Sequence, residues 1–323
     1  MRFSRRSLLI GTAALLVTAP LRANEQDMLT IEGPAFGAGW RVRIGAQADG
    51  NAVAAAVMEV VRSVDDTMSP FRAETEISRL NAAQTRDWLP VSPNVMPTLH
   101  EARRVHDLTL GAFDPTLGGV SGRYGFSPIR QAPAGRFAGV TLGAGRLRKD
   151  APGQSFDLCG IAKGRALDRV VAAIAGLGHR DFFVEMGGEV MARGRHPAGR
   201  DWSVGVEHPT AQIGALWHRV ALNGEALATS GDRVNSYLSG AHRYGHIIDP
   251  RSQRPADTPL ASVSVFAPTA MTADALATAL FALGPEAGPE LAQRADLAAL
   301  FLIRDGDHLR AVTTADYATR IVT

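Results

Sequence analysis

The sequence of 323 residues is long enough for one large domain or two intimately packed ones. With 46% hydrophobic and 20% charged residues, it has the composition of an ordinary globular protein. The formal charge of +2 falls to −2 without the first 23 residues, because these hold four of the 34 basic residues and none of the 32 acidic ones. No long basic run remains, so nucleic-acid binding has no electrostatic support.

The first 23 residues predict an export signal. Arg5 and Arg6 lie in a positively charged start, residues 7–20 are uncharged and mostly apolar, and Ala23 suits cleavage. The apolar stretch is too short to span a bilayer comfortably. The arginine pair is typical of the twin-arginine route, and an ordinary secretory signal is the alternative. We therefore expect a periplasmic protein consisting of residues 24–323.

The first half of the mature chain predicts one strand and three helices. They are a strand over residues 40–44, helices over 52–68 and 97–109, and a short helical turn over 77–81. Pro70 ends the first helix, because a proline disfavours helical conformation in the preceding residue. Gly111 ends the helix over 97–109. We expect residues 112–155 to be rich in loops, with short strands at most.

The second half interleaves strands with helices. The predicted elements are a helix over 165–176, strands over 182–186, 202–206, 227–231 and 262–266, a helix over 272–283, and a terminal hairpin of 299–303 and 309–312. Gly187 and Gly188 end a buried strand, and Gly284 ends the last helix. No linker or repeat divides the chain, so the fold class is mixed α/β in one mature unit.

The segment DLCGIAKG, residues 157–164, predicts a turn that leads into a helix. Glycines let the backbone approach a phosphate, and a helix N-terminus favours an anion, although a plain turn at a helix start explains the segment about as well. Lys163 is one of only two lysines against 32 arginines, which favours a ligand contact made by a compact ammonium. Cys159 is the only cysteine, so no disulfide forms within the chain. A lone cysteine is more often a buried structural residue than a catalytic thiol.

Asp274 and Thr278 lie four residues apart on a predicted helix, and therefore on one face of it. A carboxylate and a hydroxyl so placed can both bind Mg²⁺, which prefers oxygen ligands and shares them with phosphates. The alternative is structural. Thr272 would then cap the helix, and Asp274 would be an acid matched to the helix dipole.

Two further segments carry polar residues at turns. In YGHIIDP, residues 244–250, His246 precedes an apolar pair and an Asp-Pro turn, where an imidazole could transfer protons. A surface histidine before an ordinary turn is an equally good explanation. In GAFDP, residues 111–115, the backbone amides of a turn could bind the edge of a ligand, although on its own the segment is only a turn.

Taken in order, the segments GAFDP, DLCGIAKG, MGGE, ATSGD, GHIIDP and MTADALAT resemble the ApbE family of FAD:protein FMN transferases. The resemblance runs from about residue 33 to near the C-terminus. It implies a mixed α/β fold of two intertwined halves related to the T-fold. Cys159 stands where the family usually has a glycine or another small residue, and Glu189 stands where an aspartate is common.

The resemblance also implies roles for particular residues. The Gly160 carbonyl and the side chains of Asp274 and Thr278 are expected to bind Mg²⁺. Lys163 is expected to neutralise phosphate charge or to hold Asp157 in place. His246 is expected to accept the hydroxyl proton, with a neighbouring carboxylate as the alternative. The residues expected to contact FAD are Phe36, Phe71, Ala112, Phe113, Asp114, Asp157, Lys163 and Ile248.

The implied reaction is phosphoryl transfer. A Thr or Ser hydroxyl of an acceptor protein attacks the riboflavin-side phosphorus of FAD, and AMP leaves. The expected acceptor belongs to a membrane-linked electron-transfer system, with a regulator of nitrous oxide respiration as the preferred partner. Two alternatives stay open: an FAD pyrophosphatase that uses water, and a non-catalytic flavin carrier. The pair of Asp274 and Thr278 favours an enzyme over a carrier.

Overall fold

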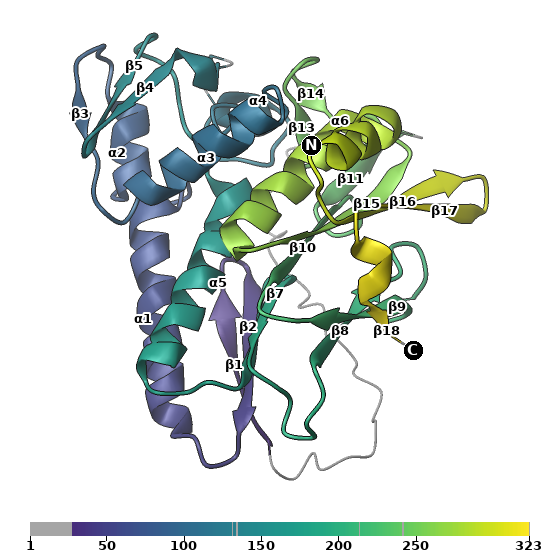
Figure 1. Ribbon diagram of the computed structural model, residues 1–323. Coiled ribbons are helices and arrows are strands. Elements are labelled where there is room, and N and C mark those ends of the chain that lie inside the picture. Colours follow the sequence, from purple (N-terminus) through teal and green to yellow (C-terminus); the bar gives the residue numbers. More distant parts are fainter. Residues whose placement is uncertain (1–27, 131, 134, 213, 241, 323) are drawn as a thin grey trace, which may run out of the picture.

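The computed structural model describes residues 28–130, 132–133, 135–212, 214–240 and 242–322. The predicted export signal lies outside these residues. An eight-stranded sheet with only antiparallel neighbours forms the centre of the molecule, in the order β1-β2-β6-β7-β10-β15-β16-β17 (Figure 1). Its strands are β1 (Met28–Ala35), β2 (Ala38–Gly45), β6 (Phe182–Met186), β7 (Glu189–Arg193), β10 (Ala226–Gly231), β15 (Leu260–Ala267), β16 (Ala299–Asp305) and β17 (His308–Thr314).

The described residues form six α-helices, which are α1 (Gly50–Met68), α2 (Glu76–Ala82), α3 (Met96–Leu108), α4 (Gly118–Arg123), α5 (Cys159–Gly176) and α6 (Ala270–Arg294). Three of them, α1, α5 and α6, pack against one face of the central sheet, and α2 and α3 pack on these helices. α5 packs between α1 and α6, and α6 lies against β10 and β15. Helix α1 shows why the sequence folds this way, because its buried valines recur at helical spacing and the Asp49 carboxylate caps its first turn.

A small sheet covers part of the opposite face. It consists of β8 (Trp202–Glu207), β9 (Leu216–Leu222) and β18 (Ile321–Val322), in the order β18-β9-β8. Its apolar residues share a second core with β6, β7, β10, β15 and β16, so the central strands are buried on both faces. The remaining short strands are β3 (Leu89–Pro90), β4 (Val140–Gly143), β5 (Arg146–Lys149), β11 (Ser236–Ser239), β12 (His242–Gly245), β13 (Ile248–Asp249) and β14 (Arg254–Pro255).

Most of the predicted elements are confirmed, and the fold is mixed α/β as expected. Three predictions differ from the structure in detail. The helix expected to start at residue 165 already begins at Cys159, and the supposed loop region 112–155 contains α4. Gly284 does interrupt α6 with a φ of +86°, but a further helical segment follows it to Arg294.

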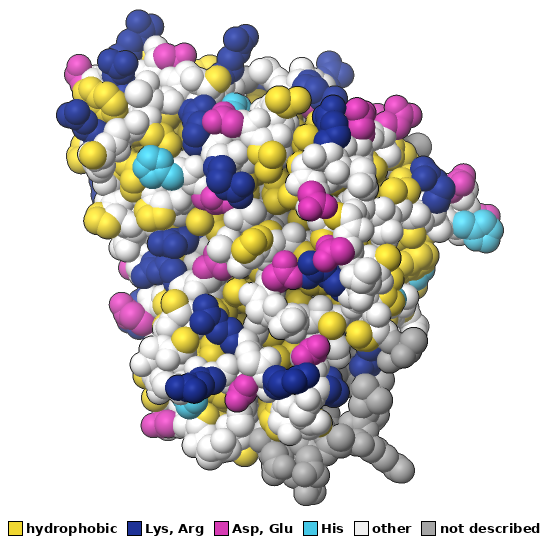
Figure 2. Space-filling model, in the orientation of Figure 1, with side chains coloured by type: hydrophobic (Ala, Val, Ile, Leu, Met, Phe, Trp, Pro, Cys, Tyr) yellow, Lys and Arg dark blue, Asp and Glu magenta, His cyan; other side chains and the backbone are white. Residues whose placement is uncertain are grey.

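Charges are interspersed on the molecular face shown in Figure 2, where basic and acidic side chains alternate over the helices. Among the helices of the described ranges, none is both long and apolar enough to cross a membrane.

Candidate functional site

The site is built where α5 meets the start of α6. A Cβ at Gly164 would lie 2.2 Å from the Ala270 carbonyl oxygen, so only glycine lets the two backbones come this close. The Asp168 carboxylate then accepts hydrogen bonds from the amides of Ala270 and Met271, at 2.7 and 3.0 Å. These bonds satisfy donors at the N-terminus of α6 and fix its position against α5.

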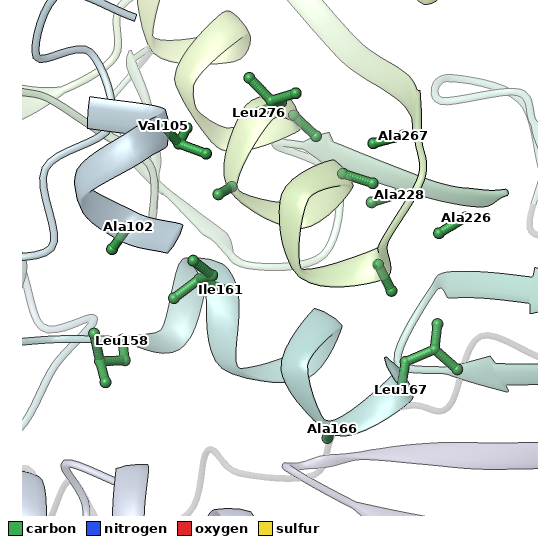
Figure 3. Close-up of a cluster of buried hydrophobic side chains, with 14 of the residues drawn as sticks. Ala102, Val105, Leu158, Ile161, Ala166, Leu167, Ala226, Ala228, Ala267 and Leu276 are labelled. Carbon is green, nitrogen blue, oxygen red and sulfur yellow. The ribbon is translucent and has the colours of Figure 1, made fainter. Parts of the chain in front are cut away.

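Apolar packing holds the same junction from the other side. Figure 3 shows Val105 of α3, Ile161 of α5 and Leu276 of α6 in one buried cluster. Glu101 of α3 accepts a hydrogen bond from the Thr272 hydroxyl at 2.5 Å, which ties α3 to the first turn of α6. The position of the polar groups on α6 therefore depends on three helices.

The junction brings one ammonium between two buried carboxylates. Lys163 Nζ lies 3.1 Å from Glu189 Oε1 and 3.3 Å from Asp274 Oδ1. Both acids are only 3% exposed. The Gly164 amide donates to Asp274 Oδ2 at 3.0 Å, whereas Glu189 Oε2 is buried without a hydrogen-bond partner among the described residues.

The electrostatics follow from this burial. Burial opposes the charge on Lys163, but Asp274 and Glu189 outweigh it and raise the pKa of the ammonium, which therefore stays charged. Burial raises the pKa of Glu189, and Lys163 only partly offsets that effect.

The three predicted metal ligands lie together. Asp274 and Thr278 share one face of α6, and a Cβ at Gly160 would lie 3.3 Å from Thr278 Oγ1. The Gly164 amide is the ordinary helical donor to the Gly160 carbonyl, and its bond to Asp274 competes for that donor. The Gly160 carbonyl therefore has capacity for another partner.

The oxygen atoms of these three residues suit Mg²⁺ as ligands. A carboxylate, a hydroxyl and a carbonyl are hard oxygen ligands, and Mg²⁺ commonly completes its shell with phosphates and water. No group of three or more His, Cys, Asp or Glu side chains suited to a metal occurs in the part of the chain that the structure describes. Mg²⁺ prefers six oxygen ligands, so three protein ligands would leave its other positions to substrate oxygens and water.

The GAFDP segment borders this cluster. The Phe113 ring is buried, and a Cβ at Gly160 would lie 3.4 Å from it. Ala112 beside it is also buried. The Asp114 carboxylate accepts hydrogen bonds from the Thr116 amide and hydroxyl and from the Phe137 amide, so it stabilises its own loop.

Asp157 joins the two glycine-containing segments. Its amide donates to the Pro115 carbonyl at 2.7 Å, and its carboxylate accepts from the Cys159 amide at 3.0 Å. This second bond lies in the first turn of α5, which helps to explain why the helix begins here. Cys159 is exposed, so the expectation of a buried structural cysteine is wrong.

His246 follows the β11–β12 hairpin. Its ring Nδ1 lies 3.2 Å from the Asn235 carbonyl oxygen. Because a carbonyl only accepts, Nδ1 carries the proton and Nε2 is left as an acceptor. Burial and, next, the charge on Lys163 lower the pKa of His246 to about 4, so the ring is neutral near pH 7. A neutral imidazole with a free Nε2 can accept a proton.

A cavity of about 280 Å³ opens beside this histidine. It is lined among others by Asp232, Arg243, His246, Phe281 and Arg304. A cavity of about 890 Å³ lies at the far end of α5, beside Arg180 and Arg193. That larger cavity contains none of the predicted site residues, so we place the candidate site at the junction and not there.

The other predicted flavin contacts are more scattered. Ile248 is buried in a small cluster with Leu117 and Val120. Phe36 is half-buried in the turn between β1 and β2, and Phe71 is 62% exposed just after α1. Sequence reasoning missed Asp168, although its position one turn after Gly164 places both residues on the same face of α5.

The chain matches known proteins along most of its length. Residues 36–301 match the model of the ApbE family. The FAD:protein FMN transferase of Vibrio cholerae is 29% identical over 97% of this chain and 98% of its own, and that of Haemophilus influenzae is 31% identical over 93% and 94%. Among solved structures, the flavin transferase ApbE of Vibrio cholerae has a TM-score of 0.82 at 28% identity, over 91% of this chain and 99% of its own. The apo flavinyl transferase ApbE of Pseudomonas stutzeri has a TM-score of 0.81 at 28% identity, over 91% and 96%.

Proposed function

Because this chain belongs to the ApbE family and is an FAD:protein FMN transferase, we propose that it performs the transfer with Mg²⁺ held by Gly160, Asp274 and Thr278. The observation that supports this proposal is the junction of α5 and α6. It brings the Lys163 ammonium to 3.3 Å from the Asp274 carboxylate, and it brings Gly160 beside the Thr278 hydroxyl on the same face of α6. Mg²⁺ bound there would neutralise charge on the phosphate oxygens.

The acceptor is proposed to be a Thr or Ser hydroxyl. Its oxygen forms a bond to the riboflavin-side phosphorus of FAD as the bond from that phosphorus to the AMP oxygen breaks. His246 Nε2 takes the hydroxyl proton, because its other ring nitrogen is already a donor to Asn235. Lys163 contributes a fixed positive charge beside the phosphates.

The sequence supports the wider setting of this proposal. The arginine pair near the N-terminus favours export by the twin-arginine route, so the acceptor would be met in the periplasm. A protein of a membrane-linked electron-transfer system, such as a regulator of nitrous oxide respiration, is the proposed partner.

The decisive experiment is incubation with FAD, Mg²⁺ and a candidate acceptor domain, followed by the intact mass of the acceptor. We expect a gain of one FMN unit together with release of AMP. Release of FMN and AMP with no gain in acceptor mass, for every acceptor tried, would identify a pyrophosphatase instead. Tight FAD binding without turnover would identify a carrier.

Substitution of Asp274 tests the metal site. Asp274→Asn keeps an oxygen for the Gly164 amide but removes the ligand charge, so we expect transfer to fall by about a hundredfold or more with the fold retained. The control is Asp305→Asn, which changes an exposed acid. Transfer rates are measured over a range of Mg²⁺ concentrations, and an unchanged rate in Asp274→Asn would remove Asp274 from the metal.

A further inference from the structure

Lys163 and the metal compete for the same carboxylate. In the structure, the ammonium lies 3.3 Å from Asp274 Oδ1, and this carboxylate is the only charged protein ligand of the metal under the proposed function. Two cations that share one carboxylate repel each other strongly in a site of low dielectric. Metal binding therefore requires another negatively charged group that stabilises the Lys163 ammonium when the Asp274 carboxylate binds the metal.

We propose that Glu189 is the positioning residue that holds Lys163 and thereby frees Asp274 for the metal. This inference rests on the proposed metal site. Glu189 Oε1 is already the nearer of the two carboxylate oxygens to Lys163, at 3.1 Å. Glu189 Oε2 has no hydrogen-bond partner among the described residues, so it can accept a second N–H from the ammonium.

The local backbone supports the role of Glu189. It is the first residue of β7 and follows Gly187 and Gly188, whose φ values are +61° and +102°. A Cβ at Gly187 would lie 3.3 Å from Lys163 Cδ and 3.6 Å from Glu189 Oε2. The tight glycine turn therefore leaves room for the lysine side chain to reach Glu189.

Removal of the Glu189 charge should make metal binding harder. The test is run near pH 9, because burial raises the pKa of this carboxyl to about 8. In Glu189→Gln, Lys163 keeps only Asp274 as a charged partner, and Mg²⁺ has to displace the ammonium from it. The readout is quenching of FAD fluorescence on binding, followed as Mg²⁺ is added at saturating FAD. We expect the half-maximal Mg²⁺ concentration to rise about tenfold, a usual effect of losing a group that orients a metal site. The matched control is Glu286→Gln, which changes an exposed glutamate.

A double variant separates this role from simple support of the fold. In Lys163→Met/Glu189→Gln no ammonium competes for Asp274, so we expect the Mg²⁺ requirement to return close to that of the unmodified chain. A Mg²⁺ requirement unchanged in Glu189→Gln, or one that rises further in the double variant, would overturn the inference. Thermal unfolding without Mg²⁺ reports the folding of each variant.

Two arms keep the test decisive. If Glu189→Gln does not fold, Glu189→Asp keeps the charge but shortens the reach to Lys163, which lies 3.1 Å from Glu189 Oε1. A raised Mg²⁺ requirement in Glu189→Asp supports the inference, and an unchanged one overturns it. If the unmodified chain binds FAD equally well with and without Mg²⁺, the proposed metal site itself is wrong. Failure of the inference and failure of the proposed function thus give different results.

Discussion

The two lysines of this arginine-rich chain both serve as internal ammonium groups. Lys149 is fully buried, and its Nζ donates to the carbonyls of Leu80 and Ala83 at the end of α2, at 2.9 and 2.6 Å. Lys163 lies between Glu189 and Asp274. In both places, one small group serves several oxygens from a single point, which a planar guanidinium does less well. The rarity of lysine in this sequence therefore indicated the two positions where a compact ammonium contacts several oxygens.

We expect Lys163→Arg to fail to restore transfer in full. The guanidinium is broad and flat, and Lys163 Cδ already lies close to the Gly187 backbone, so the larger group would displace the carboxylates or the flavin. A misplacement of about 1 Å costs roughly a hundredfold in rate when catalysis depends on positioning. FMN transfer by Lys163→Arg and Lys163→Ala is compared, with FAD affinity measured separately. An Arg variant as fast as the unmodified chain would reduce Lys163 to a generic positive charge.

The pH dependence of transfer tests His246. Its pKa is lowered to about 4, so the ring stays neutral and able to accept a proton from neutral pH down towards that value. As the pH falls through about 4, Nε2 becomes protonated and transfer should decline. We expect no inflection near the ordinary histidine pKa of about 6.5. Single-turnover rates, normalised to the folded fraction at each pH, make the comparison, and an inflection near 6.5 that disappears in His246→Ala would contradict this prediction.

At the scale of elements, periodicity predicted the long helices and the main strands, because their burial patterns repeat over many residues. Periodicity failed where contacts with other parts of the fold determine where an element begins or whether it forms. α5 begins early at Cys159, whose amide donates to the Asp157 carboxylate, and α4 is too short to show a period. The alternation over residues 262–266 predicted a strand but not its burial, because Ser264 is buried and pairs with the Thr229 hydroxyl across the sheet at 2.8 Å.

The packing of α5 on α6 gives a prediction with an internal control. In Gly164→Ala the new methyl group would meet the Ala270 carbonyl at 2.2 Å, and backbone cannot yield as a flexible side chain would. We expect the free energy of unfolding to fall by about 3 kcal/mol, together with weakened FAD binding. Gly176 lies on the same helix, and a Cβ there would meet no described atom within 4 Å beyond its own stretch of helix, so Gly176→Ala should change stability by less than about 1 kcal/mol. Urea unfolding of both variants decides the matter, and equal stabilities would show that the helices separate easily.

At the scale of the whole molecule, the ordered segments predicted which residues would meet, although they lie far apart in sequence. Gly160, Lys163, Asp274 and Thr278 do come together. No periodicity could supply the contribution of Glu189, because its contact with Lys163 depends on how β7 follows the glycine turn. The proximity of the predicted metal ligands and Lys163 was thus accessible from the sequence, whereas the contact between Glu189 and Lys163 was not.

The fold also bears on the predicted export of the protein. β2 near the N-terminus pairs with β6, and β18 at the other end pairs with β9, so segments from the whole chain must be present before the fold is complete. A route that carries folded proteins suits such a chain, and Arg5 and Arg6 match that route, although they lie outside the described residues.

We expect replacement of both arginines by lysine to keep the precursor in the cytoplasm, because the pair is read by a receptor and not as bulk charge. Arg22→Lys is the control and should be exported and cleaved near Asn24. Cell fractionation with immunoblotting and the mass of the mature N-terminus measure the result, and normal export of the double variant would rule out this route.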